Sequence, residues 1–229
     1  RDLMGLGGWY ADVAALALGA LSALALPPLH LVPVLLVTVP GLLMLVEATA
    51  TPFQAARRGW WFGFGLNVLG LYWITEAILV EASRYWWLVP LAVPALAAVM
   101  AAFIAPACWA AKMARPGLPR VVVLAGAWTL LDLARQFVAT GFPWNPLGSV
   151  WAVPGLAGDV MIQPAAWVGV HGLTLATLLL AGLPLLGRCA WLVLAMSLAL
   201  WVGGGAMRLS VPLPDEPGLT VILVQGNVP

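Results

Sequence analysis

Seven long apolar runs divide the chain, and Pro, Gly or charged residues bound each of them. A bilayer core about 30 Å thick needs about 20 apolar residues to be crossed as a helix. Runs of this length are too long for strands, so they predict seven transmembrane helices. The predicted helices cover residues 10–26, 29–46, 59–79, 86–111, 120–139, 163–186 and 190–206. The expected fold class is therefore an all-α polytopic membrane protein.

The pattern changes at the end of the chain. Three prolines lie between residues 212 and 217, and a β-branched apolar run over 219–226 follows them. This run is too short to cross a membrane and predicts a buried strand. Because a lone strand leaves its backbone groups without partners, we expect it to be the first strand of a sheet domain that continues past Pro229. We therefore expect a helical bundle over residues 1–209, and a linker with this first strand over 210–229.

Composition supports the membrane assignment. Hydrophobic residues make up 63% of the chain, charged residues 8%, and the mean hydropathy is +1.00. Soluble domains are nearer half apolar and a quarter charged. The net charge is only +1 and no Lys/Arg cluster could follow phosphates, so a nucleic-acid partner is excluded. Two cysteines and two isolated histidines give no metal-ligand spacing, and neither a metal nor a cofactor is expected.

The basic residues predict an orientation. Lys and Arg near the ends of spans stay on the cytoplasmic side. Three alternate loops hold six of them, whereas the loops on the other side hold Arg84 and Arg208; the six are Arg57, Arg58, Lys112, Arg115, Arg120 and Arg188. We therefore expect a multi-pass membrane protein with a cytoplasmic N-terminus and a C-terminal end on the outer, periplasmic side.

Aromatic residues mark two candidate contacts with substrate. Tyr72 and Trp73 fall near the outer interface, where they could anchor the third helix or border a route for lipids. The long outer loop after the fifth helix contains Phe142, Trp144 and Asn145 and no basic residue as far as residue 159. A loop of this length is usually functional, although it could instead be a hydrophobic plug that closes the bundle.

The fifth predicted helix carries Asp132 and Arg135, three residues apart and hence on one helical face. Charge inside a membrane is costly, so the two side chains should pair toward the interior of the bundle. We favour a structural clamp between helix and loop over direct contact with a lipid headgroup.

Five segments together resemble successive landmarks of the apolipoprotein N-acyltransferase family. They are Gly63-Phe-Gly65 with Gly70-Leu-Tyr-Trp-Ile; Asp132 and Arg135; Thr140-Gly-Phe-Pro-Trp144; Gln163-Pro-Ala-Ala-Trp-Val-Gly-Val-His-Gly172; and Val224-Gln-Gly-Asn-Val-Pro229. The resemblance covers the whole chain in the same order. The family often has Glu at the position of Asp132, and Tyr or Glu at that of His171, so neither position is tied to a fixed chemistry.

The resemblance implies a function. The family transfers an acyl chain from a phospholipid donor to the lipidated N-terminal cysteine of an apolipoprotein. A Glu-Lys-Cys triad in a periplasmic nitrilase-like domain forms a thioester intermediate by ping-pong chemistry. Because this sequence stops at the first strand of that domain, no catalytic residue is expected in it, Cys108 and Cys189 included, and the chain alone should be inactive. We expect it to act as a monomer among membrane lipids.

Two alternatives from other classes stay open at this point. A small transporter or channel would be expected to show internal repeats or broken helices with polar residues at mid-membrane, and no convincing repeat is present. A purely structural membrane anchor would have no substrate pocket.

Overall fold

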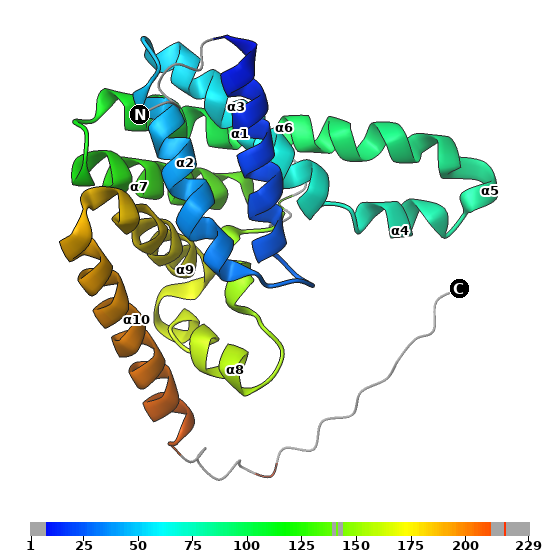
Figure 1. The fold of residues 1–229 in the computed structure, drawn as a ribbon. Helices are drawn as coiled ribbons and strands as arrows, with labels where there is room; N and C mark the ends of the chain where they lie inside the picture. Colours follow the sequence, from blue (N-terminus) through cyan, green and yellow to red (C-terminus); the bar gives the residue numbers. More distant parts are fainter. Residues whose placement is uncertain (1–7, 139–140, 142–143, 212–217, 219–229) are drawn as a thin grey trace.

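The computed structural model describes residues 8–138, 141, 144–211 and 218, and Figure 1 shows that their regular structure is helical. Each of the seven predicted ranges contains a helix. The main helices are α1 (Trp9–Ser22), α2 (Leu35–Glu47), α3 (Pro52–Gly70), α6 (Val89–Met113), α7 (Leu118–Arg135), α9 (Ala165–Gly182) and α10 (Arg188–Leu209). The predicted strand at 219–226 lies outside the described residues.

Short elements join the main helices. They are α4 (Ile74–Leu79), α5 (Ala82–Tyr85), α8 (Leu156–Ile162) and the 3-10 turns Ala23–Ala25, Val32–Val34, Trp86–Leu88, Leu147–Trp151 and Leu183–Leu186. Figure 1 shows that α4, α5 and the adjoining part of α6 project from the bundle, and that α10 lies along its edge.

Three helical segments of the described chain are long and apolar enough to cross a membrane: Ala82–Met113, Ala165–Leu186 and Arg188–Leu209. The segments Trp9–Ala25 and Val32–Glu47 are apolar but shorter. The helix α3 carries Arg57 and Arg58, and α7 carries three charged residues, which lowers the hydropathy of both. The chain is therefore a helical membrane protein, with three membrane-length segments among its described residues.

The third helix differs most from the hydropathy pattern. Hydropathy places it at residues 59–79, whereas α3 begins at Pro52 and ends at Gly70. Its start is set by Thr51, whose side-chain oxygen accepts a hydrogen bond from the Gln54 backbone N–H at 3.3 Å, and by Pro52 in the first turn. Such caps are local features, and hydropathy averaged over the length of a membrane span does not detect them.

Small residues let α3 pack closely in the middle of the bundle. A Cβ atom added to Gly63 would lie 2.9 Å from the Cα of Ala101 on α6, so the two backbones nearly touch there. Gly65 is similarly close to the backbone of α1 near Leu16. This is the small-residue packing expected of helices in lipid, where close van der Waals contact replaces the hydrophobic effect.

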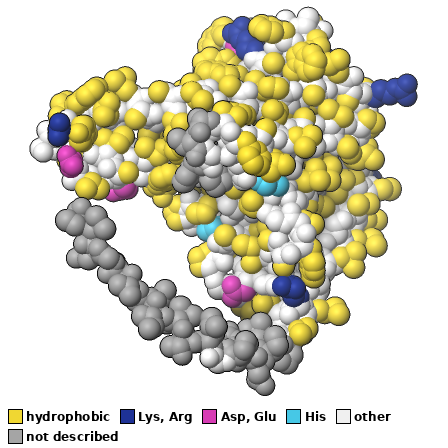
Figure 2. All heavy atoms as spheres, turned by 180° about the vertical axis from the view of Figure 1, so that it is seen from behind, with side chains coloured by type: hydrophobic (Ala, Val, Ile, Leu, Met, Phe, Trp, Pro, Cys, Tyr) yellow, Lys and Arg dark blue, Asp and Glu magenta, His cyan; other side chains and the backbone are white. Residues whose placement is uncertain are grey.

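Charged groups gather at one end of the bundle. Asp12 on α1 pairs with Arg57, at 2.5 Å, and with Arg58 on α3. Glu47 joins nearby helix ends. Its carboxylate lies 3.3 Å from the Arg120 guanidinium, and its backbone carbonyl accepts a hydrogen bond from Lys112 Nζ at 2.9 Å. Figure 2 shows a face on which hydrophobic side chains are frequent among neutral and backbone atoms, with few charges, mostly near the extremities.

Candidate functional site

At the opposite end of α3 from these charges, the helix is tied to the loop that follows α7. The side-chain Nδ2 of Asn145 donates to the Gly70 carbonyl at 2.5 Å, across 75 residues of sequence. Asn145 has a positive φ of 37°, a conformation in which Asn is better tolerated than most residues. A Cβ at Gly70 would lie 2.9 Å from the Cδ1 of Leu26 and 3.3 Å from Nδ2 of Asn145, so both side chains pack closely over this glycine.

The same junction contains an aromatic stack. The rings of Trp73 and Trp144 lie 6.1 Å apart with an interplanar angle of 21°, a geometry typical of offset stacking. Trp144 also packs against a small buried cluster that includes Leu71 and Met100. Tyr72, by contrast, is about half exposed. The structure thus brings four of the five proposed substrate-contacting residues to one end of the bundle, and Phe142 lies outside the described residues.

Behind this junction lies a buried ion pair. Asp132 Oδ1 and Arg135 Nη2 are 2.9 Å apart, and their side chains are only 2% and 5% exposed. Asn67 and Asn145 line the same small cavity between α3, α6 and α7. Its volume of about 10 Å³ is enough for about one water molecule and too small for a lipid headgroup. The geometry therefore favours a clamp over a headgroup site.

A second polar contact joins α7 to α9. Gln136 Nε2 and His171 Nε2 lie 2.7 Å apart. His171 follows an interruption of α9 at Gly169, whose φ of 64° and ψ of −177° are not helical. Among the described residues, no three His, Cys, Asp or Glu side chains come together as metal ligands would.

Asn67 and Gln136 were not among the residues predicted from the sequence to form a site. Asn67 is buried, and its Nδ2 donates to the Gly63 carbonyl one turn earlier at 2.7 Å. A signal existed for Asn67, because a polar residue within an apolar helix usually faces the interior of a bundle. For Gln136 there was none, since it lies at a helix end where polar residues are ordinary.

The two thiols lie apart from this junction. Cys108 on α6 is fully buried, and its Sγ would be 2.7 Å from a Cβ placed on Gly59 of α3, so it packs between two helices. Cys189 is exposed in the first turn of α10. Both thiols are free, and no described residue forms a hydrogen bond to either of them, whereas nucleophilic catalysis needs a base beside the thiol and donors for the oxyanion.

Comparison with known proteins agrees with the motif evidence. The family described as apolipoprotein N-acyltransferase N-terminal domain matches residues 18–183. A protein of Allorhizobium ampelinum named apolipoprotein N-acyltransferase is 40% identical over 243 residues, covering 99% of this chain and 45% of that protein. Proteins of the same name from Rhodopseudomonas palustris and Caulobacter vibrioides are 36% and 38% identical, covering 97% and 96% of this chain and 44% and 42% of their own lengths. The chain thus spans a little under half the length of the curated relatives it matches. It belongs to the apolipoprotein N-acyltransferase family, and it corresponds to the N-terminal part of these proteins.

Proposed function

We propose that this chain is the membrane part of an enzyme that transfers an acyl chain from a phospholipid to the N-terminal S-diacylglyceryl-cysteine of apolipoproteins in the bacterial inner membrane. The observation that carries the proposal is the similarity along nearly the whole chain to proteins with this named activity. In such a reaction a thiolate attacks the phospholipid ester, forming a thioester and releasing a lysophospholipid. The amino group of the lipidated cysteine then attacks the thioester, which forms the amide and regenerates the thiol.

The role we assign to this chain is to hold and admit substrates, not to carry out the chemistry. The catalytic residues would lie in a nitrilase-like domain after Pro229. Seven crossings with a cytoplasmic N-terminus would place the junction of Trp73, Trp144 and Asn145 at the periplasmic side, next to that domain. The clustering of Asp12, Arg57 and Arg58 at the other end of α3 supports this orientation.

We further propose that Tyr72, Trp73, Phe142, Trp144 and Asn145 border the route by which lipid substrates leave the bilayer. The stack of Trp73 on Trp144 supports this role, because it joins an apolar loop to the foot of the projecting helices α4 and α5. Lipid substrates arrive from the bilayer, and half-exposed aromatic residues at the interface suit contact with both the chain and the headgroup region. Asp132 and Arg135 would support this junction from behind.

Replacement of Trp144 by Ala in the intact enzyme tests the proposed route. Loss of the aromatic stack would loosen the loop by about 0.5–1.5 kcal/mol. If the loop borders the lipid route, turnover measured with a fluorescent phospholipid donor and a diacylglyceryl peptide should fall, and by more than the melting temperature would account for. Trp191→Ala is the control, since Trp191 is half exposed on α10 at the other end of the bundle. Equal turnover of the Trp144→Ala variant and the parent enzyme, at matched expression, would contradict the proposed route. The loop would then be a hydrophobic plug that closes the bundle.

A further inference from the structure

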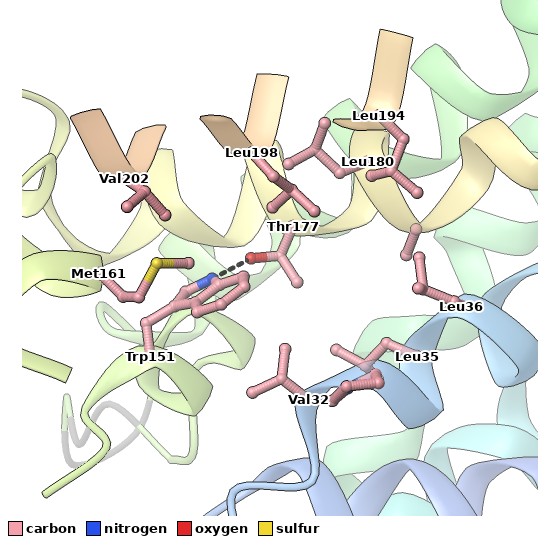
Figure 3. Close-up of a pocket in the computed structure, with 12 residues that line it drawn as sticks. Val32, Leu35, Leu36, Trp151, Met161, Thr177, Leu180, Leu194, Leu198 and Val202 are labelled. Carbon is pink, nitrogen blue, oxygen red and sulfur yellow. Dashed lines mark hydrogen bonds between the residues drawn. The ribbon is translucent and has the colours of Figure 1, made fainter. Parts of the chain in front are cut away.

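The helix α10 lies at the edge of the bundle and packs on it mainly near its two ends. Of its 22 residues, the buried ones are Ala190, Leu194 and Gly205. A cavity of about 300 Å³ separates its middle from α2 and α9. Figure 3 shows Leu198 and Val202 of α10 facing Leu36 of α2 across this cavity. The position of α10 therefore depends on the contacts at its ends.

Near its C-terminal end, α10 is docked on α8. Trp201, Gly205 and Arg208 follow one another at spacings of four and three residues, so they share one face of the helix. The Trp201 indole N–H donates to the Met161 carbonyl at 2.8 Å, in the last turn of α8, where carbonyls lack partners within the helix. A Cβ added to Gly205 would overlap the Val160 carbonyl, so the two helices touch there.

Arg208 makes the last contact on this face. Its Nε donates to Oε1 of Gln163 at 2.9 Å, and its guanidinium carbon lies 5.2 Å from the centre of the Trp167 ring, a cation–π distance. Gln163 is itself held, because its Nε2 donates to the Asp159 carbonyl at 2.8 Å. The side chain of Arg208 is thus fixed by two groups at the junction of α8 and α9, and these three side chains are called the Arg208 contact below.

The Arg208 contact explains a part of the sequence for which the proposed substrate route has no use. Gln163 and Trp167 belong to the segment 163–172, one of the five that resemble the family. Arg208 and Trp167 are both exposed, and exposed charged contacts contribute little to stability. The main effect of the contact is therefore on where α10 ends, not on how stable the bundle is.

The end of α10 is also where the chain leaves the bundle. The helix ends at Leu209, one residue after Arg208. Prolines at 212, 214 and 217 follow in the sequence, just before the strand predicted at 219–226. Proline-rich linkers are extended and semi-rigid, whereas linkers of Gly and Ser are flexible coils. A linker of this composition passes a change of direction on to whatever follows it.

We propose that Arg208 is a positioning residue: held by Gln163 and Trp167, it fixes the end of α10 and so the direction in which the chain enters the catalytic domain. The domain is thereby kept over the bundle, where its thiol can reach lipid substrates. This proposal rests on the function proposed above, and it assigns Arg208 no contact with substrate.

Kinetics of the intact enzyme with two acyl donors test the proposal. One donor is a phospholipid in vesicles, and the other is a water-soluble short-chain nitrophenyl ester. The thiolate attacks either ester and forms a thioester, releasing a lysophospholipid or nitrophenolate. Arg208→Ala should lower phospholipid turnover about three- to tenfold and leave the burst of nitrophenolate unchanged, because the soluble ester reaches the thiol from water whatever the position of the domain.

Two further variants serve as a repeat and a control. Trp167→Ala removes the stacking partner and should give the same pattern as Arg208→Ala. Arg188→Ala removes an exposed arginine at the first residue of the same helix, to which no described residue forms a hydrogen bond or ion pair, and it should change neither reaction.

A double-variant cycle shows whether Arg208 acts through the linker. Replacing the prolines at 212, 214 and 217 by Gly makes the linker flexible, so it should lower phospholipid turnover by itself. Adding Arg208→Ala to this variant should then lower turnover by less than about twofold more, since the two changes interrupt the same connection.

Hydrogen exchange of the intact enzyme tests the Arg208 contact without reference to activity. Amides of residues 206–211 should exchange about threefold faster or more in Arg208→Ala, because the end of α10 has lost an attachment. Unchanged exchange would contradict the contact. Parent-like phospholipid turnover, equal losses with both donors, or losses that multiply in the double variant would each overturn the positioning role. A parent enzyme that transfers no acyl group from phospholipid would instead contradict the proposed function, and exchange would then decide the contact by itself.

Discussion

Replacing Asp132 by Ala should destabilise the bundle strongly, because it leaves a buried cation without its counter-charge. Asp132 lies 2.9 Å from Arg135, and the two side chains are 2% and 5% exposed. The remaining contact of the guanidinium is weak: its Nη1 lies 3.9 Å from the Met100 sulfur. Its Nε has no hydrogen-bond partner among the described residues.

The magnitude follows from the balance of two large terms. At 2.9 Å and an effective dielectric constant of about 20, the attraction is about 6 kcal/mol. Desolvation of the two ions costs several kcal/mol each, so the intact pair contributes little net stability. Removing one partner leaves the desolvation cost of the other ion but loses the attraction between the two. Such changes typically destabilise a protein by about 3–5 kcal/mol. For a chain of this size, that corresponds to a fall in melting temperature of about 6–20 °C.

The informative comparison is with the double variant Asp132→Leu with Arg135→Met. Replacing both ions by apolar groups of similar size is often neutral, so this variant should recover most of the lost melting temperature. Melting of detergent-purified protein, followed by size-exclusion chromatography, gives the stabilities, and acyl transfer by the intact enzyme gives the function.

The two measurements separate a clamp from a lipid contact. If the pair is a clamp, the double variant recovers both stability and turnover. Recovery of stability without turnover would instead mean that the pair meets the substrate. A fall of less than about 2 °C in the single variant Asp132→Ala would refute the reasoning from burial altogether.

Three further predictions concern topology, packing and chemistry. In a background without native cysteines, Ser83→Cys should react with an impermeant thiol reagent added from outside, whereas Pro116→Cys should react only after the membrane is permeabilised. The reverse pattern would invert the proposed orientation. Gly63→Ala should destabilise the protein by about 1–3 kcal/mol, because the new Cβ would lie 2.9 Å from the Ala101 Cα. In Gly126→Ala the new Cβ meets nothing within 4 Å, so this variant should be more stable by up to about 1 kcal/mol. Thermal melting of both variants checks this, and equal shifts in melting temperature would contradict the packing argument. The 229-residue chain, incubated with phospholipid vesicles, should gain no hydroxylamine-sensitive acyl group by intact mass, because no described residue is arranged around Cys108 or Cys189 as a base for a nucleophile. An acyl adduct would place the nucleophile in this chain.

The sequence alone determined the helical architecture and the family. In a bilayer a single segment can satisfy its own backbone hydrogen bonds only as a helix, so apolar runs of sufficient length leave little choice. The runs at 10–26 and 190–206 match α1 and α10 closely for this reason. Family membership followed from several short motifs in a fixed order. Such motifs can be recognised in the sequence without knowing which helices are in contact.

The sequence also predicted a contact between residues that are close in the chain, but it did not predict contacts between residues that are far apart in the chain. Asp132 and Arg135 pair because three residues of helix bring them to one face. The hydrogen bond from Asn145 to Gly70 and the stack of Trp73 on Trp144 join segments far apart in the chain, so only the folded arrangement reveals them. The early start of α3 escaped detection because a basic first half hides a helix from hydropathy.

The cavity between α2, α9 and α10 shows most clearly what only the tertiary structure decides. Along α10, Leu194, Leu198 and Leu200 are the same residue in the same apolar context, yet Leu194 and Leu198 line the cavity whereas Leu200 is 75% exposed. In water, hydrophobicity tells an inner face from an outer one. In a membrane both faces are apolar, since lipid is as apolar as leucine, and the choice between protein and lipid contact depends on how well the helix surfaces fit together.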